Sequence, residues 1–180
     1  IFEVKILLGP KERHSKSKAI KITEDMSREV WEQYYIPKLP GNVSIDEAPD
    51  PVPVRAAYVY VDKVAEENEW VTLMSSVKDE KDARRSREFA EKHQPGTGKY
   101  HREGVNVIYY PKDVVAHYQG RTDDNNHDSI SASVMREDIA VMDLDNFTTN
   151  LPDEVKDDAE KILKIFNPTG NISTDLTDLE

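Results

Sequence analysis

Residues 54–64, Val-Arg-Ala-Ala-Tyr-Val-Tyr-Val-Asp-Lys-Val, are rich in β-branched and aromatic side chains, and their central part has a strand-like period of two. Such a period places alternate side chains on opposite faces of a strand. The polar residues 66–68 separate this run from a second strand-like run at 69–77. The sequence therefore predicts a β-hairpin over 54–77 that lies centrally in a sheet.

Further strand-like runs lie on both sides of this hairpin. The last two are joined only by residues 136–138 and are predicted to form another hairpin. Strands that are joined as hairpins pair antiparallel, so we expect a largely antiparallel sheet built from hairpins. The runs cover residues 1–8, 18–23, 105–110, 129–135 and 139–144.

Four other segments have helical signals. Thr23 is a suitable N-cap, and the apolar side chains after it recur at helical spacing. These are Met26, Val30 and Tyr34, with Trp31 and Tyr35 in a neighbouring row. Further helices are predicted at 78–93, 111–118 and 152–166, the last with Val155, Ala159, Ile162, Leu163 and Phe166 on one face. The expected fold class is α+β, with three to four helices packed mainly on one face of the sheet.

The length of 180 residues favours one domain. Residues 37–53 contain five prolines and few apolar side chains, which predicts an extended connector. We expect a single α+β domain over 1–166 that includes this connector, followed by an acidic and flexible tail at 167–180. The start at Ile1 favours a domain, or a processed piece, of a larger protein.

The charge is large and unevenly distributed. The chain carries a net charge of −11, and 33% of its residues are charged. Residues 1–22 have six Lys/Arg and two acids, a surplus of +4, whereas residues 137–180 have twelve acids and three Lys, a surplus of −9. A strongly acidic protein repels phosphate backbones, so the composition disfavours nucleic-acid binding.

The chain has no cysteine, which excludes disulfides and thiolate metal sites. This favours a cytoplasmic or otherwise intracellular location. No apolar run approaches the roughly 20 residues that span a bilayer, so we expect a soluble chain without a membrane span.

Asp143 and Asp145 are the first candidates for catalysis. They follow the apolar run at 139–142 and lie two positions apart, so on a strand both would point to the same side. Two carboxylates on one side could bind one divalent cation. The more ordinary interpretation is a strand that ends in a polar turn, where Asp and Asn are common.

The run Val-Met-Asp-Leu-Asp-Asn-Phe-Thr at 141–148 locally resembles the strand-end Asp-x-Asp motif of haloacid-dehalogenase-like phosphatases. The resemblance covers about eight residues. It implies a nucleophile at Asp143 and an acid/base at Asp145. That family needs a long α/β chain after the motif, whereas only 35 residues follow Asp145, so the chain is not assigned to it.

A second candidate metal site is the polar loop at 119–128. Its side chains would suit calcium or a transition metal, but the loop lacks the glycine and the final glutamate of an EF-hand. A solvated acidic loop is the favoured interpretation. The candidate ligands are Asp123, Asp124, His127 and Asp128.

Two basic sets are candidate interaction residues: Lys11, Arg13, Lys16 and Lys18 before the second strand-like run, and Arg84, Arg85 and Arg87 on a predicted helix. The first set could bind an acidic protein surface, including the acidic tail of a second copy. The leading hypothesis is a non-enzymatic protein-interaction or assembly module that binds a partner or itself through sheet edges and opposed charges, with no cofactor. A divalent-metal phosphoester enzyme at Asp143 and Asp145 is the alternative, and nucleic-acid contact through residues 11–18 is the weaker alternative.

Overall fold

The computed structural model describes residues 2–74, 80–109 and 132–170, with the backbone alone at 80–83. The chain divides into two compact units, Ile1–Glu47 together with Thr122–Glu180, and Ala48–Arg121. Each unit has its own apolar core. This division into units does not test the single domain predicted over 1–166, which stays a prediction.

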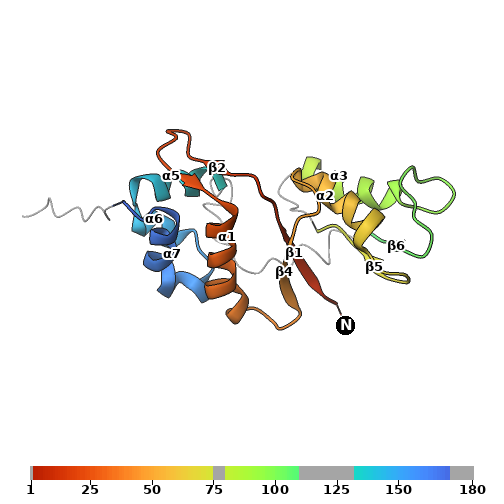
Figure 1. Cartoon of the computed structure of the whole chain (residues 1–180), viewed down its shortest axis with the longest axis horizontal. Helices are drawn as coiled ribbons and strands as arrows, with labels where there is room; N and C mark the ends of the chain where they lie inside the picture. The colour runs from red at the N-terminus through yellow and green to blue at the C-terminus, as the bar shows by residue number, and fades with distance from the viewer. Residues whose placement is uncertain (1, 75–79, 110–131, 171–180) are drawn as a thin grey trace, which may run out of the picture. The chain divides into compact units, whose positions relative to one another are not determined.

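Helix α1 (Glu24–Val30) opens the helical part of the first unit (Figure 1). Its N-cap is Thr23, whose hydroxyl accepts a hydrogen bond from the N–H of Met26 at 3.2 Å. A π-helical turn (Trp31–Tyr35) and a 3-10 turn (Ile36–Lys38) continue it. The helix predicted after Thr23 is confirmed, and its apolar row supplies buried Val30 to the core, with Met26 and Tyr34 packed beside it.

The C-terminal part of the first unit packs against α1. It consists of α5 (Ala132–Val141), α6 (Leu144–Thr149), a 3-10 turn (Asp153–Asp158) and α7 (Ala159–Phe166). The helix predicted at 152–166 is therefore confirmed as a 3-10 turn that continues into α7. The shared core contains Ile20, Ile22, Val30, Ile139, Met142, Phe147, Leu151, Val155, Ala159, Ile162 and Leu163.

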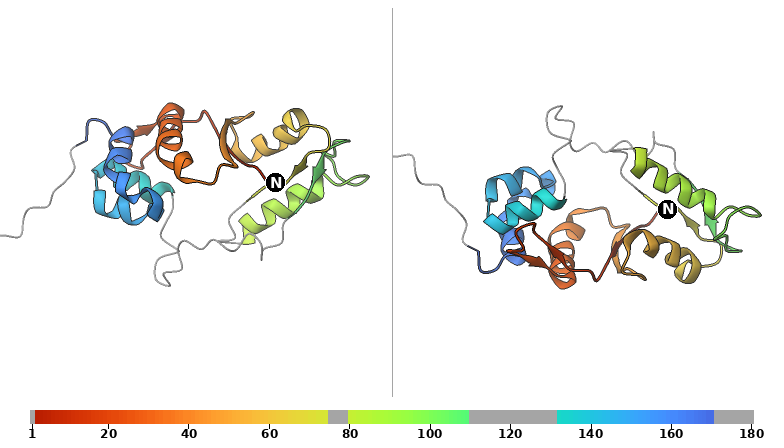
Figure 2. Two further views of the ribbon diagram at one scale, coloured as in Figure 1. Left: turned by 90° about the horizontal axis from the view of Figure 1, so that it is seen from below. Right: turned by 90° about the horizontal axis from the view of Figure 1, so that it is seen from above.

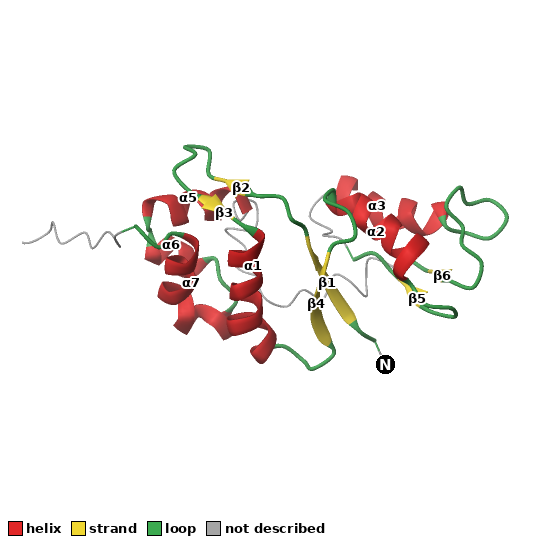
Figure 3. Ribbon diagram, in the orientation of Figure 1, coloured by secondary structure: helices red, strands yellow, loops and turns green. Residues whose placement is uncertain are grey.

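The described strands of the first unit form two small ladders (Figure 3). β1 (Val4–Leu8) pairs in parallel with β4 (Val43–Glu47), which lies inside the Pro-rich segment. β2 (Arg13–His14) pairs antiparallel with β3 (Lys21–Ile22) over only two residues.

The described residues of the second unit form two α-helices and a short ladder (Figure 2). α2 (Pro53–Val59) continues as a π-helical turn (Tyr60–Val64). β5 (Trp70–Val71) pairs in parallel with β6 (Asn106–Val107), and α3 (Glu80–Lys92) lies between them in the chain. The core contains Ala57, Tyr60, Val61, Ala65, Phe89, Ala90, Val105 and Val107.

The predicted antiparallel sheet of hairpins is wrong. The described residues contain six α-helices, and every ladder has only two strands. Two of the three ladders are parallel. The fold is therefore mainly helical, and its strands are short.

Both predicted hairpins fail for the same reason. Residues 54–64 are helical, and their buried side chains are Ala56, Ala57, Tyr60 and Val61, which share one helix face but not one strand face. Likewise, the segment 132–141 is helix α5, with Met135 and Ile139 on the core one turn apart. A short run of apolar residues fits either period, and the available burial surface decides between them.

No helix in the described part of the chain is both long and apolar enough to cross a membrane. The helix predicted at 111–118 lies outside the described residues.

Candidate interaction site

Residues 11–18, hereafter the basic turn, have a fixed backbone. The buried Ser15 hydroxyl accepts a hydrogen bond from the N–H of Ala19 at 3.0 Å and pairs with the Ser17 hydroxyl at 2.9 Å. The N–H of Lys18 donates to the Ser15 carbonyl at 3.0 Å, and Lys18 has a left-handed φ of 57°. Serine is suited to such turns because its hydroxyl can satisfy nearby backbone groups.

The basic turn is also attached to helix α5. The N–H of Lys16 donates to Oε1 of Glu137. One residue earlier on α5, Nε of Arg136 donates to the carbonyl of His14 at 2.9 Å. The turn therefore presents its side chains from a base that is fixed at two points.

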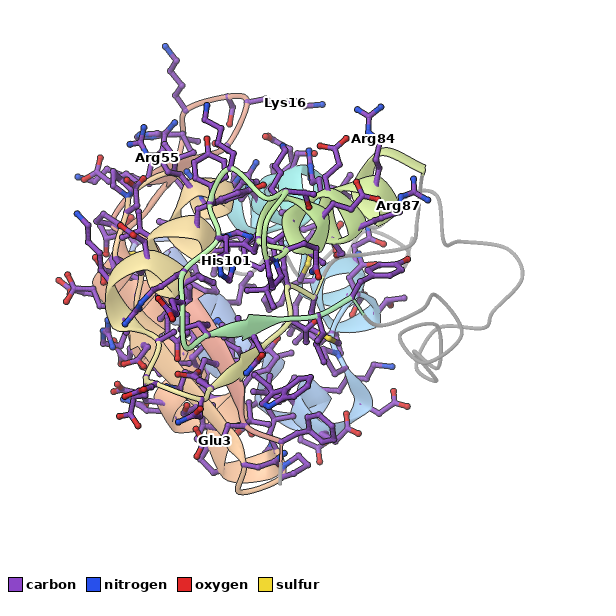
Figure 4. All side chains as sticks on the ribbon, turned by 90° about the vertical axis from the view of Figure 1, so that its right-hand side faces the viewer. Glu3, Lys16, Arg55, Arg84, Arg87 and His101 are labelled. Carbon is purple, nitrogen blue, oxygen red and sulfur yellow. The ribbon has the colours of Figure 1, made fainter. Side chains whose placement is uncertain are left out.

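The positive charge of the basic turn is not neutralised within the described residues. Lys11, Lys16 and Lys18 are exposed, and Arg13 is half-buried. The described part of the chain contains no ion pair to any of these four side chains. Glu12, the acid within the turn, is engaged instead by Lys21 at 3.0 Å. Figure 4 shows Lys16 extending away from the ribbon. Within the described residues, no internal ion pair would have to break before these side chains met a carboxylate.

The arginines of helix α3 belong to the second unit. Nε of Arg84 lies 3.0 Å from a carboxylate oxygen of Glu88, which is also 3.4 Å from Nζ of Lys92. Arg84 and Arg87 lie on the exposed side of α3 (Figure 4). Exposed pairs of this kind contribute little to stability, about 0.3–0.5 kcal/mol each. The two predicted basic sets thus lie in different units, and their role in partner binding stays a prediction.

The β1–β4 ladder is a second candidate surface. Its register pairs Val4 with Val43 and Ile6 with Ile45. Paired residues share a face, so these four aliphatic side chains form one apolar face. None of them is fully buried, and Val4 is 42% exposed. Parallel strands normally have both faces covered, so this ladder is unusually open in the described chain.

Asp143 lies at the start of helix α6 and not on a strand. Its Oδ1 accepts the N–H of Asn146 at 3.0 Å, and its Oδ2 accepts Nδ2 of Asn146 at 2.7 Å. Asp145 is exposed in the first turn of the same helix. The geometric premise of the catalytic prediction, two carboxylates on one side of a strand, is therefore wrong. The N-cap hydrogen bond accounts for Oδ1 of Asp143, and the side-chain amide of Asn146 accounts for Oδ2.

Asp138 and Asp143 are neighbouring carboxylates at the α5–α6 junction. The N–H of Asp143 donates to the Asp138 carbonyl at 2.9 Å. Burial, and secondarily the nearby Asp143 charge, raise the pKa of Asp138 above its ordinary value. Within the described residues, no group of three His, Asp or Glu side chains could hold a metal ion.

The other candidate ligands are Asp123, Asp124, His127 and Asp128, all of which lie outside the described residues. Their role as metal ligands stays a prediction.

Sequence reasoning missed a buried histidine in the second unit. His93 is only 2% exposed, and its Nδ1 lies 2.6 Å from the Phe89 carbonyl. The centroid of its ring lies 5.1 Å from that of Tyr58, 4.5 Å from that of Phe89 and 6.0 Å from that of Tyr100. Nε2 is buried and has no hydrogen-bond partner in the described part of the chain. Burial lowers the pKa of His93, which favours the neutral form of the ring. The spacing of Phe89 and His93, one helical turn, was the available signal.

The segment 95–99, which has a glycine pattern loosely like a phosphate loop, closes the end of α3. The N–H of Tyr100 donates to the Lys92 carbonyl, and the N–H of Gly98 to the Gln94 carbonyl, both at 2.9 Å. A Cβ at Gly98 would lie 2.5 Å from the Lys92 carbonyl oxygen. This glycine is therefore required for close packing against the helix end.

No protein-family model matches the chain, and neither a curated protein nor a solved structure matches it.

Proposed function

We propose that this chain is a non-enzymatic protein-interaction module that binds acidic protein segments through the basic turn. The observation that carries the proposal is the combination of a fixed turn backbone with four cationic side chains that have no ion pair among the described residues. Because the backbone is already ordered, binding a partner costs less conformational entropy than ordering a flexible loop.

Acidic protein is favoured over nucleic acid as the ligand. The net charge of −11 repels a polyphosphate at long range, whereas a short acidic segment carries far less charge to be repelled. Residues 11–18 also contain no Phe, Tyr or Trp on which bases could stack.

A second copy of the chain could supply such an acidic segment. Several acids of residues 153–160 are already paired, including Asp158 with Lys38 at 2.6 Å and Glu160 with Lys164 at 2.7 Å. The sequence 171–180 contains Asp175, Asp178 and Glu180 and no basic residue. A peptide with this sequence is therefore the natural first probe for the basic turn.

The test is fluorescence anisotropy of a labelled 171–180 peptide with the full chain at low salt. The double variant Lys11→Glu/Lys16→Glu reverses two exposed charges of the turn. We expect about a tenfold loss of affinity, since each exposed ion pair contributes up to about 1 kcal/mol. Binding by the unaltered chain should also weaken as salt is raised.

The matched control is Lys63→Glu/Lys99→Glu, which changes the net charge equally on exposed side chains of the second unit. Equal losses in the two double variants would show a non-specific charge effect and refute the proposal. Tighter binding of a mixed oligonucleotide pool than of the acidic peptide would replace it with nucleic-acid recognition. Sedimentation equilibrium of the full chain at low and high salt then tells whether the acidic partner is a second copy.

A further inference from the structure

The outer edge of β4 carries backbone groups that are not used in the β1–β4 ladder. The N–H of Val4 donates to the Asn42 carbonyl at 2.8 Å, and Val4 is in register with Val43. In a parallel ladder with this hydrogen bond, the N–H and C=O groups of Ser44 and Asp46 point toward β1. Those of the alternate residues, Val43, Ile45 and Glu47, point away from it. No other described strand pairs with β4.

Part of this edge is already satisfied locally. The N–H of Val43 donates to the Pro40 carbonyl at 3.0 Å. The outward groups that remain are the carbonyls of Val43, Ile45 and Glu47 and the N–H groups of Ile45 and Glu47. They alternate between acceptor and donor along the edge, which is the pattern that an added strand pairs with.

The side chains along the edge differ between the two faces of the ladder. Val43 and Ile45 are half-buried on the apolar face. Ser44 and Asp46 are exposed on the other face. Glu47 is exposed at the end of the strand, on the side of Val43 and Ile45. An added strand would therefore meet apolar side chains on one face and carboxylates on the other face and at one end.

We propose that the outer edge of β4 binds an extended segment of a partner protein in which apolar residues alternate with Lys or Arg. The apolar residues of that segment would extend the face formed by Val43 and Ile45. Its basic residues would lie on the face of Asp46, where opposite charges across strands are stabilising. Glu47 adds a further negative charge at the end of the same edge. Backbone hydrogen bonds supply the affinity in this mode of recognition, and the alternating side chains supply the specificity.

This surface is separate from the basic turn and has the opposite charge preference. A two-stranded ladder is marginally stable by itself, and a third strand would add backbone hydrogen bonds and widen its apolar face. A second copy of β4 is a poorer occupant, because it would bring a further Asp46 and Glu47 to the same edge in a chain of net charge −11.

The test uses the full chain and three labelled peptides. One peptide alternates Val and Lys over seven residues, the second alternates Val and Glu, and the third is the Val/Lys peptide with N-methylated backbone amides. We expect the unaltered chain to bind the Val/Lys peptide but not its N-methylated form. Any Val/Glu binding by the unaltered chain should occur at the basic turn and should be lost in Lys11→Glu/Lys16→Glu. In the double variant Asp46→Lys/Glu47→Lys, Val/Lys binding should fall at least about tenfold, and Val/Glu binding that does not depend on Lys11 and Lys16 should appear.

Two control variants separate this site from non-specific charge and from the basic turn. Glu154→Lys/Asp157→Lys changes the same net charge on exposed acids of the first unit and should bind the Val/Lys peptide normally. Lys11→Glu/Lys16→Glu should also bind the Val/Lys peptide normally. The two proposals are therefore tested independently, because failure of either one leaves the result for the other unchanged.

Hydrogen exchange gives the second readout. Addition of the Val/Lys peptide should slow exchange at the amides of Ile45 and Glu47. Slow exchange at both amides in the dilute chain without peptide would mean that another part of the chain covers the edge. Protection that appears only as the chain is concentrated would mean that a second copy does. Either result, or equal Val/Lys binding by the Asp46→Lys/Glu47→Lys variant, would overturn the proposal.

Discussion

The backbone N–H of Lys16 donates a hydrogen bond to the carboxylate of Glu137, a residue 121 positions later in the chain. With the Arg136 contact to the His14 carbonyl, this bond ties the basic turn to helix α5. The position of four cationic side chains thus depends on a helix that the sequence places far from them. The site that we propose for acidic partners is therefore a tertiary feature.

Removing the Glu137 carboxylate should loosen the basic turn. We expect Glu137→Ala to lower the free energy of unfolding by about 1 kcal/mol, because an N–H loses a charged acceptor. Hydrogen exchange at the Lys16 amide should speed up. Urea unfolding and amide exchange measure the two effects.

Glu137→Gln is the conservative partner of that variant, because its amide oxygen can still accept the bond. Glu154→Ala, which removes an exposed carboxylate without an ion pair in the described residues, is the matched control. Equal exchange rates at Lys16 in Glu137→Ala and in the unaltered chain would contradict the anchoring role.

His93 should make stability depend on pH. Burial among Tyr58, Phe89 and Tyr100, together with nearby His101, lowers its folded-state pKa below the unfolded value of about 6.5. Above that pH, His93 is neutral in both the folded and the unfolded chain, so its burial does not lower the free energy of unfolding through protonation. Below it the unfolded chain takes up the proton more readily, so stability falls as pH decreases toward the folded-state pKa.

The variant His93→Phe should remove this part of the pH dependence, since phenylalanine suits the same aromatic surroundings and Nε2 has no partner in the described chain. Thermal unfolding between pH 5 and pH 8 tests it. His14→Gln, which alters an exposed imidazole of the first unit, is the control. An unchanged pH profile in His93→Phe would show that other groups cause the acid sensitivity.

Asp143 should behave as a helix cap. We expect Asp143→Ala to destabilise the chain by about 0.5–2 kcal/mol, whereas Asp143→Asn should be much closer to the unaltered chain because Asn is also a good N-cap. Asp145→Ala should have a smaller effect, since this exposed acid contributes only through the helix dipole. Urea unfolding of the three variants gives the comparison.

The same variants test the metal-dependent alternative. If Asp143 acts only as a cap, Mg²⁺, Mn²⁺ and Ca²⁺ should change the melting temperature of Asp143→Asn and of the unaltered chain by the same amount. A metal-dependent increase that is lost in Asp143→Asn would favour a metal site at Asp143 and Asp145 instead.

Gly98 should be intolerant of any side chain. In Gly98→Ala the new Cβ would lie 2.5–2.7 Å from backbone atoms of Lys92 and Gln94. The end of α3 would have to move, at a cost of about 1–3 kcal/mol. Gly41→Ala is the control, because a Cβ there meets nothing within 4 Å. Similar unfolding free energies for the two variants would show that the segment after α3 relaxes freely.

Local signals were sufficient for several helices. Thr23, followed by acids and a regular apolar row, predicts α1, and the structure has the cap hydrogen bond. The charged segment 78–93 predicts α3, and the face containing Val155, Ile162 and Leu163 predicts the terminal helix. Each of these signals lies within a few turns of one chain segment, so no distant contact is needed to interpret it.

The conformation of residues 54–64 and 132–141 depended on tertiary structure. Their apolar residues are dense enough to satisfy a strand period as well as a helical one. Ala56, Tyr60 and Val61 are buried together only when the segment is helical and packs near Phe89 of α3. The strand interpretation of residues 54–64 is wrong because the core of the second unit packs against one face of a helix there.

Sequence alone therefore determined the charge distribution, the absence of cysteine and the helices with strong local caps and faces. Tertiary structure decided that β1 pairs with β4 in parallel, that the basic turn is held by α5, and that Asp143 caps a helix. The physical reason is that these features depend on contacts between segments far apart in the chain. Their energies come from burial and hydrogen bonds that no single segment contains.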